Sequence, residues 1–309
     1  MRRGTGGVIA GIVLGVAACS DRGSETIDSA RVPARAASLD SLERRIAAVA
    51  DSIDGSVGFA AVHIPSGARL SHNGDRRYPL RSVYKLPIGL SVLRRVDAGE
   101  LRLDSAITVT EADYAPNHSP LRDRAGGKPA TVTVDSLLVL TIEQSDNTAS
   151  DVLLRLAGGP AATMRDMQSL GLGDVRVDRT ERELGSARDS DDDERDTATP
   201  NAMADFLVVI QQGTGLSRAS HRRLLEIMQR TRTGPNRIRG LLPPNTPVAH
   251  KTGTARPMTN DAGVVTLPDG RGYVAIAVFV RSTAGAPAAR ERVIAEIARE
   301  VYDYFSAPN

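Results

Sequence analysis

Ser82-Val83-Tyr84-Lys85 opens the stretch that decides the fold of this 309-residue chain. An apolar segment with leucines at helical spacing follows it directly, and Gly99 is placed to end the helix. Residues three apart lie on one side of a helix, so the Lys85 amine can stand beside the Ser82 hydroxyl. The pattern predicts a helix from about Val83, with Ser82 at its positively polarised end.

Two further short motifs follow at long intervals along the chain. Ser145-Asp146-Asn147 lies between two apolar segments, 134–144 and 148–156, which have the spacing of helices. We therefore expect Asp146 to cap the second helix. Lys251-Thr252-Gly253 lies instead among short apolar runs and the turn Pro268-Asp269-Gly270, a pattern typical of strands joined by hairpins.

Together the three motifs hold the groups that acyl transfer through a serine requires. A serine hydroxyl is a weak nucleophile, so Ser82 needs a nearby base and donors for the developing oxyanion. Lys85 can be that base if burial and a second cation, Lys251, lower its pKa, and Lys251 could also attract an anionic substrate. Ser145 can pass a proton to a departing nitrogen, and Asn147 can hold a substrate amide. A Ser-x-x-Lys pair alone is more often a solvated pair on a helix, and it is the combination that favours catalysis.

A fourth motif adds a carboxylate that could activate water. Asp178-Arg179-Thr180-Glu181-Arg182-Glu183-Leu184 is polar enough to be an ordinary solvated loop when taken by itself. Beside a nucleophilic serine, however, Glu181 becomes a candidate general base, with Glu183 as its competitor.

In this order the motifs resemble those of the class A serine β-lactamases, and the resemblance extends from about Leu39 to Phe305. The segments 233–237 and 249–254 are most similar to the branch that contains several extended-spectrum cephalosporinases. The resemblance implies β-lactam hydrolysis through a Ser82 acyl-enzyme, which a Glu181-activated water hydrolyses, and with it β-lactam resistance. It implies no cofactor. Whether Lys85 or Glu181 primes the serine stays open.

The resemblance also implies several substrate contacts. Thr252 would bind substrate, and the backbone N–H of Thr254 would be the second oxyanion donor beside that of Ser82. Arg237 would bind the carboxylate that β-lactams carry, since a guanidinium suits a carboxylate in two-point contact. His118 occupies the place of an aromatic residue that walls the site, although a surface-loop histidine is an equal alternative.

The segment that holds Glu181 would form an Ω-shaped loop closed by an ion pair between Arg179 and Asp196. Gly185 stands where the family usually has an asparagine that helps to hold the hydrolytic water, so we expect slow deacylation of some substrates and inefficient carbapenem hydrolysis. The acidic run 189–194 is expected to be solvated, with a bound cation as the alternative.

Two other functions share the first three motifs. A D-alanyl-D-alanine carboxypeptidase or penicillin-binding protein acylates the same kind of serine but normally lacks a carboxylate poised to hydrolyse the adduct, so Glu181 argues against it. A non-hydrolytic β-lactam sensor would stop after acylation. That role calls for a transmembrane signalling segment, and the sequence predicts none after the apolar N-terminal stretch of residues 8–18.

Element order predicts an α/β (α+β) fold of the β-lactamase/transpeptidase type. An antiparallel sheet flanked by N- and C-terminal helices would form one lobe, from residues of about 38–80 and 231–309. An all-helical lobe of about 81–230 would be inserted within it, with the catalytic groups where the two lobes meet. The helix at Thr199-Pro200 is expected to start with a capping threonine and a first-turn proline.

The N-terminus carries an export pattern. Arg2-Arg3 precedes the apolar stretch Val8 to Ala18, which suits a signal peptide over residues 1–18. Cys19, the single cysteine, ends a sequence that resembles a lipobox, so we expect lipidation there, a flexible tether over 19–37 and a membrane-anchored protein in the bacterial periplasm. Soluble periplasmic release is the alternative.

Composition excludes other classes. The formal net charge of +2 and the dispersed arginines give no basis for nucleic-acid binding. The five histidines show no close metal-ligand spacing, so a zinc hydrolase is not expected. We expect a monomer that binds a small-molecule substrate.

Overall fold

The computed structural model describes residues 1, 31–186 and 193–308. The predicted leader, Cys19 and residues 20–30 of the expected tether lie outside the described residues. Residues 31–37, also expected in the tether, are the first turns of helix α1 (Arg31–Ala50). The described residues from Ser38 onward form one compact unit, and the architecture below is the architecture of that unit.

A five-stranded antiparallel sheet forms the framework, with the strand order β2-β1-β9-β8-β7. Its central pairing joins the beginning and the end of the chain, with Phe59 of β1 opposite Val278 of β9. The strands are β1 (Ser56–His63), β2 (Ala68–His72), β7 (Val248–Ala255), β8 (Met258–Thr266) and β9 (Tyr273–Arg281).

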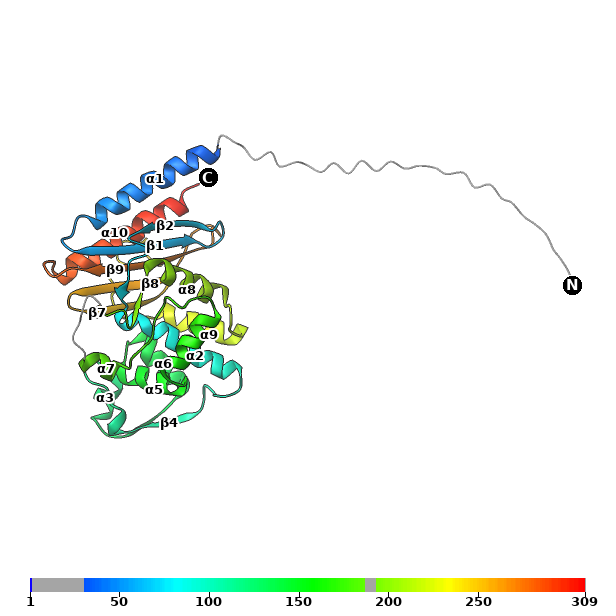
Figure 1. The fold of residues 1–309 in the computed structure, drawn as a ribbon, viewed down its shortest axis with the longest axis vertical. Helices are drawn as coiled ribbons and strands as arrows, with labels where there is room; N and C mark the ends of the chain where they lie inside the picture. The colour runs from blue at the N-terminus through cyan, green and yellow to red at the C-terminus, as the bar shows by residue number, and fades with distance from the viewer. Residues whose placement is uncertain (2–30, 187–192, 309) are drawn as a thin grey trace. The chain divides into compact units, whose positions relative to one another are not determined.

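Side chains alternate between the two faces of the sheet, as the period of two requires. Phe59 and Val278 point to the face that α1 and α10 (Pro287–Ser306) cover (Figure 1). The predicted apolar stripe of the last helix is buried there, including Ile294 and Ile297. This face therefore encloses a core of its own, separate from the one beneath the helical lobe.

The opposite face carries Ala60, Ala277 and Phe279 and packs against the helical part of the chain, with α8 (Pro200–Gln212) directly on the sheet. The predicted fold class is confirmed.

The other helices are α2 (Lys85–Asp97), α3 (Pro120–Ala125), α4 (Val134–Glu143), α5 (Asn147–Leu156), α6 (Gly159–Ser169), α7 (Glu181–Ser186) and α9 (Arg218–Gln229), with 3-10 turns η1 (Arg81–Tyr84) and η2 (Glu111–Asp113). Two small sheets pair β3 (Tyr78–Pro79) with β6 (Thr197–Ala198) and β4 (Ala106–Val109) with β5 (Ala130–Thr133).

Helix ends follow the predicted chemistry with one difference. Asp146 caps α5 by accepting from Ala149 N at 2.9 Å, and Thr199 caps α8 with Pro200 in its first turn, both as predicted. The α-helix expected from about Val83 begins only at Lys85, because residues 81–84 form a tighter 3-10 turn. In the described part of the chain, no helix is long and apolar enough to cross a membrane.

Candidate active site

An open cleft of about 490 Å³ lies where the predicted catalytic motifs meet. It is lined by residues from η1, the α4–α5 junction, α7 and β7. The predicted site residues in its lining are Ser82, His118, Ser145, Asn147, Glu181, Thr252 and Thr254. Segments far apart in the sequence therefore converge on one surface, as the motifs require.

Contacts with the sheet hold the turn that carries Ser82. Asn260 of β8 donates its side-chain amide to the carbonyls of Pro79 at 2.8 Å and Leu80 at 3.1 Å. On β7, a Cβ at Gly253 would lie 2.5 Å from the Leu80 carbonyl oxygen, so only glycine lets the strand pass this close. Strands β7 and β8 thereby fix the position of Ser82 in the cleft.

Lys85 is fully buried beside Ser82 and connects the other catalytic motifs. Its ammonium donates to Ser145 O and to Asn147 Oδ1, both at 2.8 Å. It also forms an ion pair with Glu181 Oε1 at 2.9 Å. The geometry of that contact is not the geometry of a hydrogen bond, and no other described residue donates to this buried oxygen. The Lys85 ammonium is thus the charged partner of this carboxylate oxygen, which accepts no hydrogen bond from the described residues.

Lys251 approaches from β7 and shares the Ser145 hydroxyl. Its ammonium donates to Ser145 Oγ at 2.9 Å and to Thr252 O at 2.8 Å, while Lys85 Nζ lies 3.5 Å from the same hydroxyl. Burial and the neighbouring Lys85 ammonium hold the pKa of Lys251 well below its usual value. Ser145 has a left-handed backbone, with φ at 61°, which aims its hydroxyl between the two lysines. The arrangement is a short route for protons.

Glu181 is the first residue of α7, and its side chain is 12% exposed. Asp151 of α5 accepts from the backbone N–H groups of Glu181 at 2.6 Å and Arg182 at 3.2 Å, so it caps this short helix. Burial raises the pKa of Asp151 to about 6, although those two N–H groups lower it. Glu183 turns back to accept from Thr180 N at 2.8 Å, so its carboxylate serves a capping box and is not directed at the nucleophile.

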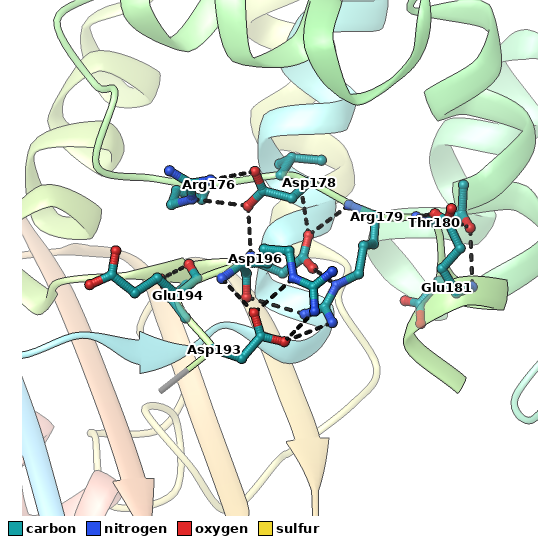
Figure 2. A network of polar contacts seen from close by, with 12 residues as sticks. Arg176, Asp178, Arg179, Thr180, Glu181, Asp193, Glu194 and Asp196 are labelled. Carbon is teal, nitrogen blue, oxygen red and sulfur yellow. Dashed lines mark hydrogen bonds and ion pairs between the residues drawn. The ribbon is translucent and has the colours of Figure 1, made fainter. Parts of the chain in front are cut away.

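The segment before and after α7 is closed by ion pairs (Figure 2). The predicted pair is confirmed, with Arg179 Nε 2.5 Å from Asp196 Oδ2, and Arg179 also contacts Asp193 at 2.9 Å. Asp178 and Asp196 accept from each other's backbone N–H, at 2.9 and 2.7 Å. Asp193 thus pairs with an arginine instead of being merely solvated, while 189–192 of the acidic run lie outside the described residues.

Arg237 lies behind the cleft and does not line it. It is 5% exposed, and its guanidinium donates to Thr254 Oγ1 at 2.8 Å and to Asn260 O at 2.9 Å. Glu291 of α10 completes the set through an ion pair at 3.1 Å. Arg237 therefore reaches the cleft through the Thr254 hydroxyl.

His118 is exposed in the loop before α3, and its Nε2 contacts Gln144 O at 2.9 Å. Its own carbonyl accepts from Asn147 N at 3.0 Å, so this loop also positions Asn147. Across residues 31–186 and 193–308, no group of three or more His, Cys, Asp or Glu residues is placed to bind a metal ion.

Three positioning groups carry no signal in the sequence. Asp151 lies on a helix face with no motif around it, Asn260 lies in a strand, and Glu291 lies in the first turns of α10. Each acts on a residue far away in the chain, so no local pattern could have identified it.

Known proteins are similar to this chain in sequence and in fold. A sequence profile of the Beta-lactamase enzyme family matches residues 41–305. The chain is 32% identical to β-lactamase VEB-1 of Pseudomonas aeruginosa, over 87% of this chain and 92% of that protein. The chain belongs to the class A β-lactamases. This β-lactamase is also 36% identical to the extended-spectrum β-lactamase PER-1 of Pseudomonas aeruginosa, over 75% of this chain and 77% of that one.

A solved structure shows the same fold. The crystal structure of the TLA-3 extended-spectrum β-lactamase superposes with a TM-score of 0.82 at 32% identity, covering 87% of this chain and all of that one. The resemblance inferred from the motifs is therefore confirmed, and the enzyme is a β-lactam hydrolase.

Proposed function

We propose that this β-lactamase opens the β-lactam amide with Ser82 and is regenerated by a water that Glu181 activates. The observation that carries this proposal is the buried Lys85 ammonium, which lies within 3 Å of Glu181, Ser145 and Asn147 at once. A single cation thereby connects the nucleophile's helix to both the acylation and the deacylation groups.

In acylation, Ser82 Oγ attacks the lactam carbonyl and loses its proton to Glu181 through water, or to Lys85 after the Lys85 ammonium has passed a proton to its ion-pair partner Glu181. The proton that Glu181 gains then returns through Lys85 to the Ser145 hydroxyl, so that Glu181 is again a carboxylate before deacylation. The carbon–nitrogen bond breaks, and the departing nitrogen takes a proton from the Ser145 hydroxyl, which Lys251 can resupply at 2.9 Å. The low pKa of Lys251 makes it a ready donor. The backbone N–H groups of Ser82 and Thr254 would stabilise the oxyanion.

In deacylation, Glu181 takes a proton from a water whose oxygen adds to the ester carbon. The tetrahedral adduct collapses, Ser82 Oγ leaves, and the proton returns to it. The buried Glu181 Oε1 supports this role, because it pairs with the Lys85 ammonium but accepts no hydrogen bond from the described residues, which leaves it able to accept a proton from water.

Substrate recognition would use the side chains that face the cleft. Asn147 would bind the acyl amide, and His118 would cover one side. The Thr252 and Thr254 hydroxyls would meet the substrate carboxylate, with Arg237 behind Thr254 contributing positive charge instead of touching the anion directly. The relatives PER-1 and TLA-3 are described as extended-spectrum enzymes, and we extend to this chain a substrate range that includes penicillins and cephalosporins.

The mature domain incubated with nitrocefin tests the mechanism against a carboxypeptidase and a sensor. Steady turnover is expected, whereas a single stoichiometric burst would support one of the alternatives. Glu181→Ala is expected to trap an acyl-enzyme visible by intact mass, with Glu183→Ala as the matched control that turns over normally. Rapid full turnover by Glu181→Ala would show that the carboxylate assignment is wrong.

The cellular setting is also a proposal. We place the enzyme in the bacterial periplasm as a monomer anchored by lipid at Cys19, where it would protect the cell from β-lactams. If Cys19→Ser stays in the membrane fraction, lipid anchoring is refuted.

A further inference from the structure

Gly185 contributes no side chain to the face of α7 that lines the cleft. It lies four residues after Glu181, one helical turn further on, and both residues line the cleft. A side chain at 185 would lie on the same face of this helix as the Glu181 side chain. With glycine there, α7 itself offers no second group to hold a water beside Glu181.

A side chain from another loop reaches this position. A Cβ built on Gly185 would lie 3.3 Å from Asn117 Nδ2 and 3.0 Å from Pro116 Cγ. Asn117 therefore occupies the region into which a residue at 185 would project. Asn117 also lines the same cleft as Ser82 and Glu181.

The loop that carries Asn117 is fixed by its carbonyls. Pro116 O accepts from Asn147 Nδ2 at 3.3 Å, and Asn117 O accepts from Arg122 Nη2 at 2.9 Å. The backbone of Asn117 is left-handed, with φ at 64°, a conformation that asparagine tolerates better than most residues. Its side-chain amide makes no hydrogen bond within the described residues, so both its donor and its acceptor are available to a ligand.

We propose that Asn117 is the positioning residue that replaces the missing side chain at Gly185 and orients the deacylating water for Glu181. A water that attacks an ester needs a base to take its proton and a second partner to fix its lone pair toward the carbon. Glu181 supplies the first and the Asn117 amide the second. This inference rests on the proposed two-step mechanism.

The test separates the two chemical steps. Asn117→Gly removes the amide and accepts the left-handed backbone, and Asn245→Gly is the matched control, an exposed turn asparagine with φ at 66° whose side chain is not part of the cleft lining. Rapid-quench intact mass with a cephalosporin gives the acylation and deacylation rate constants. In Asn117→Gly we expect deacylation to slow about tenfold, with acylation within twofold of the parent. The acyl-enzyme fraction at steady state should rise accordingly, while Asn245→Gly keeps both constants.

A rescue variant distinguishes water positioning from a structural role. Removing the Asn117 side chain frees the space beside position 185, so Asn117→Gly combined with Gly185→Asn should restore deacylation to within about threefold of the parent. Asn117→Ala serves as a second variant if the glycine variant unfolds at assay temperature.

Several outcomes would overturn the inference. A fall in acylation with unchanged deacylation would make Asn117 a substrate contact, and unchanged constants would give it no role. Failure of the rescue would mean that the amide does not act on the water. Failure of the proposed two-step mechanism would give a different result, because the parent enzyme would then form no acyl-enzyme or would never release it.

Discussion

Different kinds of contact hold the two sides of the cleft in place. The lysine side, consisting of Lys85, Ser145 and Lys251, has both ammonium groups at 0% exposure and rests on the apolar core under α2 and α4. The loop side, consisting of residues 176–186 with the closing segment 193–196, is held by partly exposed arginines and carboxylates. The groups for acylation are therefore anchored in the core, and the group for deacylation is anchored by polar contacts near solvent.

This difference predicts how the enzyme fails. Segments with few buried apolar contacts open locally at a lower free energy than the core does. Perturbations should thus slow deacylation before they slow acylation, so that the damaged enzyme accumulates as a covalent adduct.

The largest expected effect tests the lysine side. Lys85→Met should lower the acylation rate constant by about 10⁴-fold, because the nucleophile loses its adjacent amine and the link to Ser145. Stopped-flow acylation with nitrocefin measures this change. No acyl-enzyme should accumulate, in contrast to Glu181→Ala, and accumulation in both variants would erase the distinction between the two sides.

A smaller effect is expected on the loop side from Arg179→Ala. The change leaves the Asp196 carboxylate, 4% exposed, without its cation and should cost about 4 kcal/mol of unfolding free energy. Deacylation should fall more than acylation in rapid-quench assays. The control is Arg69→Ala, which breaks an ion pair with Asp205 whose side chains are 50% and 46% exposed and should cost less than about 1 kcal/mol. Equal losses in denaturant unfolding would contradict the argument.

The smallest expected effect is a pH dependence carried by Asp151. Because burial raises its pKa in the folded protein to about 6, the folded state binds this proton more tightly than the unfolded chain does. Its contribution to stability is complete below about pH 4 and is lost as the pH rises through 6, by at most about 3 kcal/mol. The difference in unfolding free energy between Asp151→Asn and the parent should therefore change over this window and be constant above it. A constant difference from pH 4 to 8 would show that Asp151 titrates normally.

Much of the site could be predicted because its signals are local. Helical spacing predicted that Ser82 and Lys85 lie together, capping chemistry predicted the role of Asp146, and the strand context predicted where Lys251 lies. All four residues lie in one region of the structure. The pairing of Arg179 with Asp196 was available only through the resemblance to the family.

The rest depends on contacts between distant segments. The surroundings of Arg237 are one example, because two strand carbonyls and Glu291 contact its guanidinium, and its contact at the cleft lining is with Thr254. Asp151 occupies a polar helix position that ordinarily faces water, and only the docking of α7 turns it into a cap. No period or motif in the sequence encodes either arrangement.

The pairing of β1 with β9 has a consequence for biosynthesis. Phe59 meets Val278, so the first long strand has no partner on its β9 side until the final third of the polypeptide has left the ribosome. Until β9 is available, β1 presents an open sheet edge on that side, and such an edge can pair with another chain during folding.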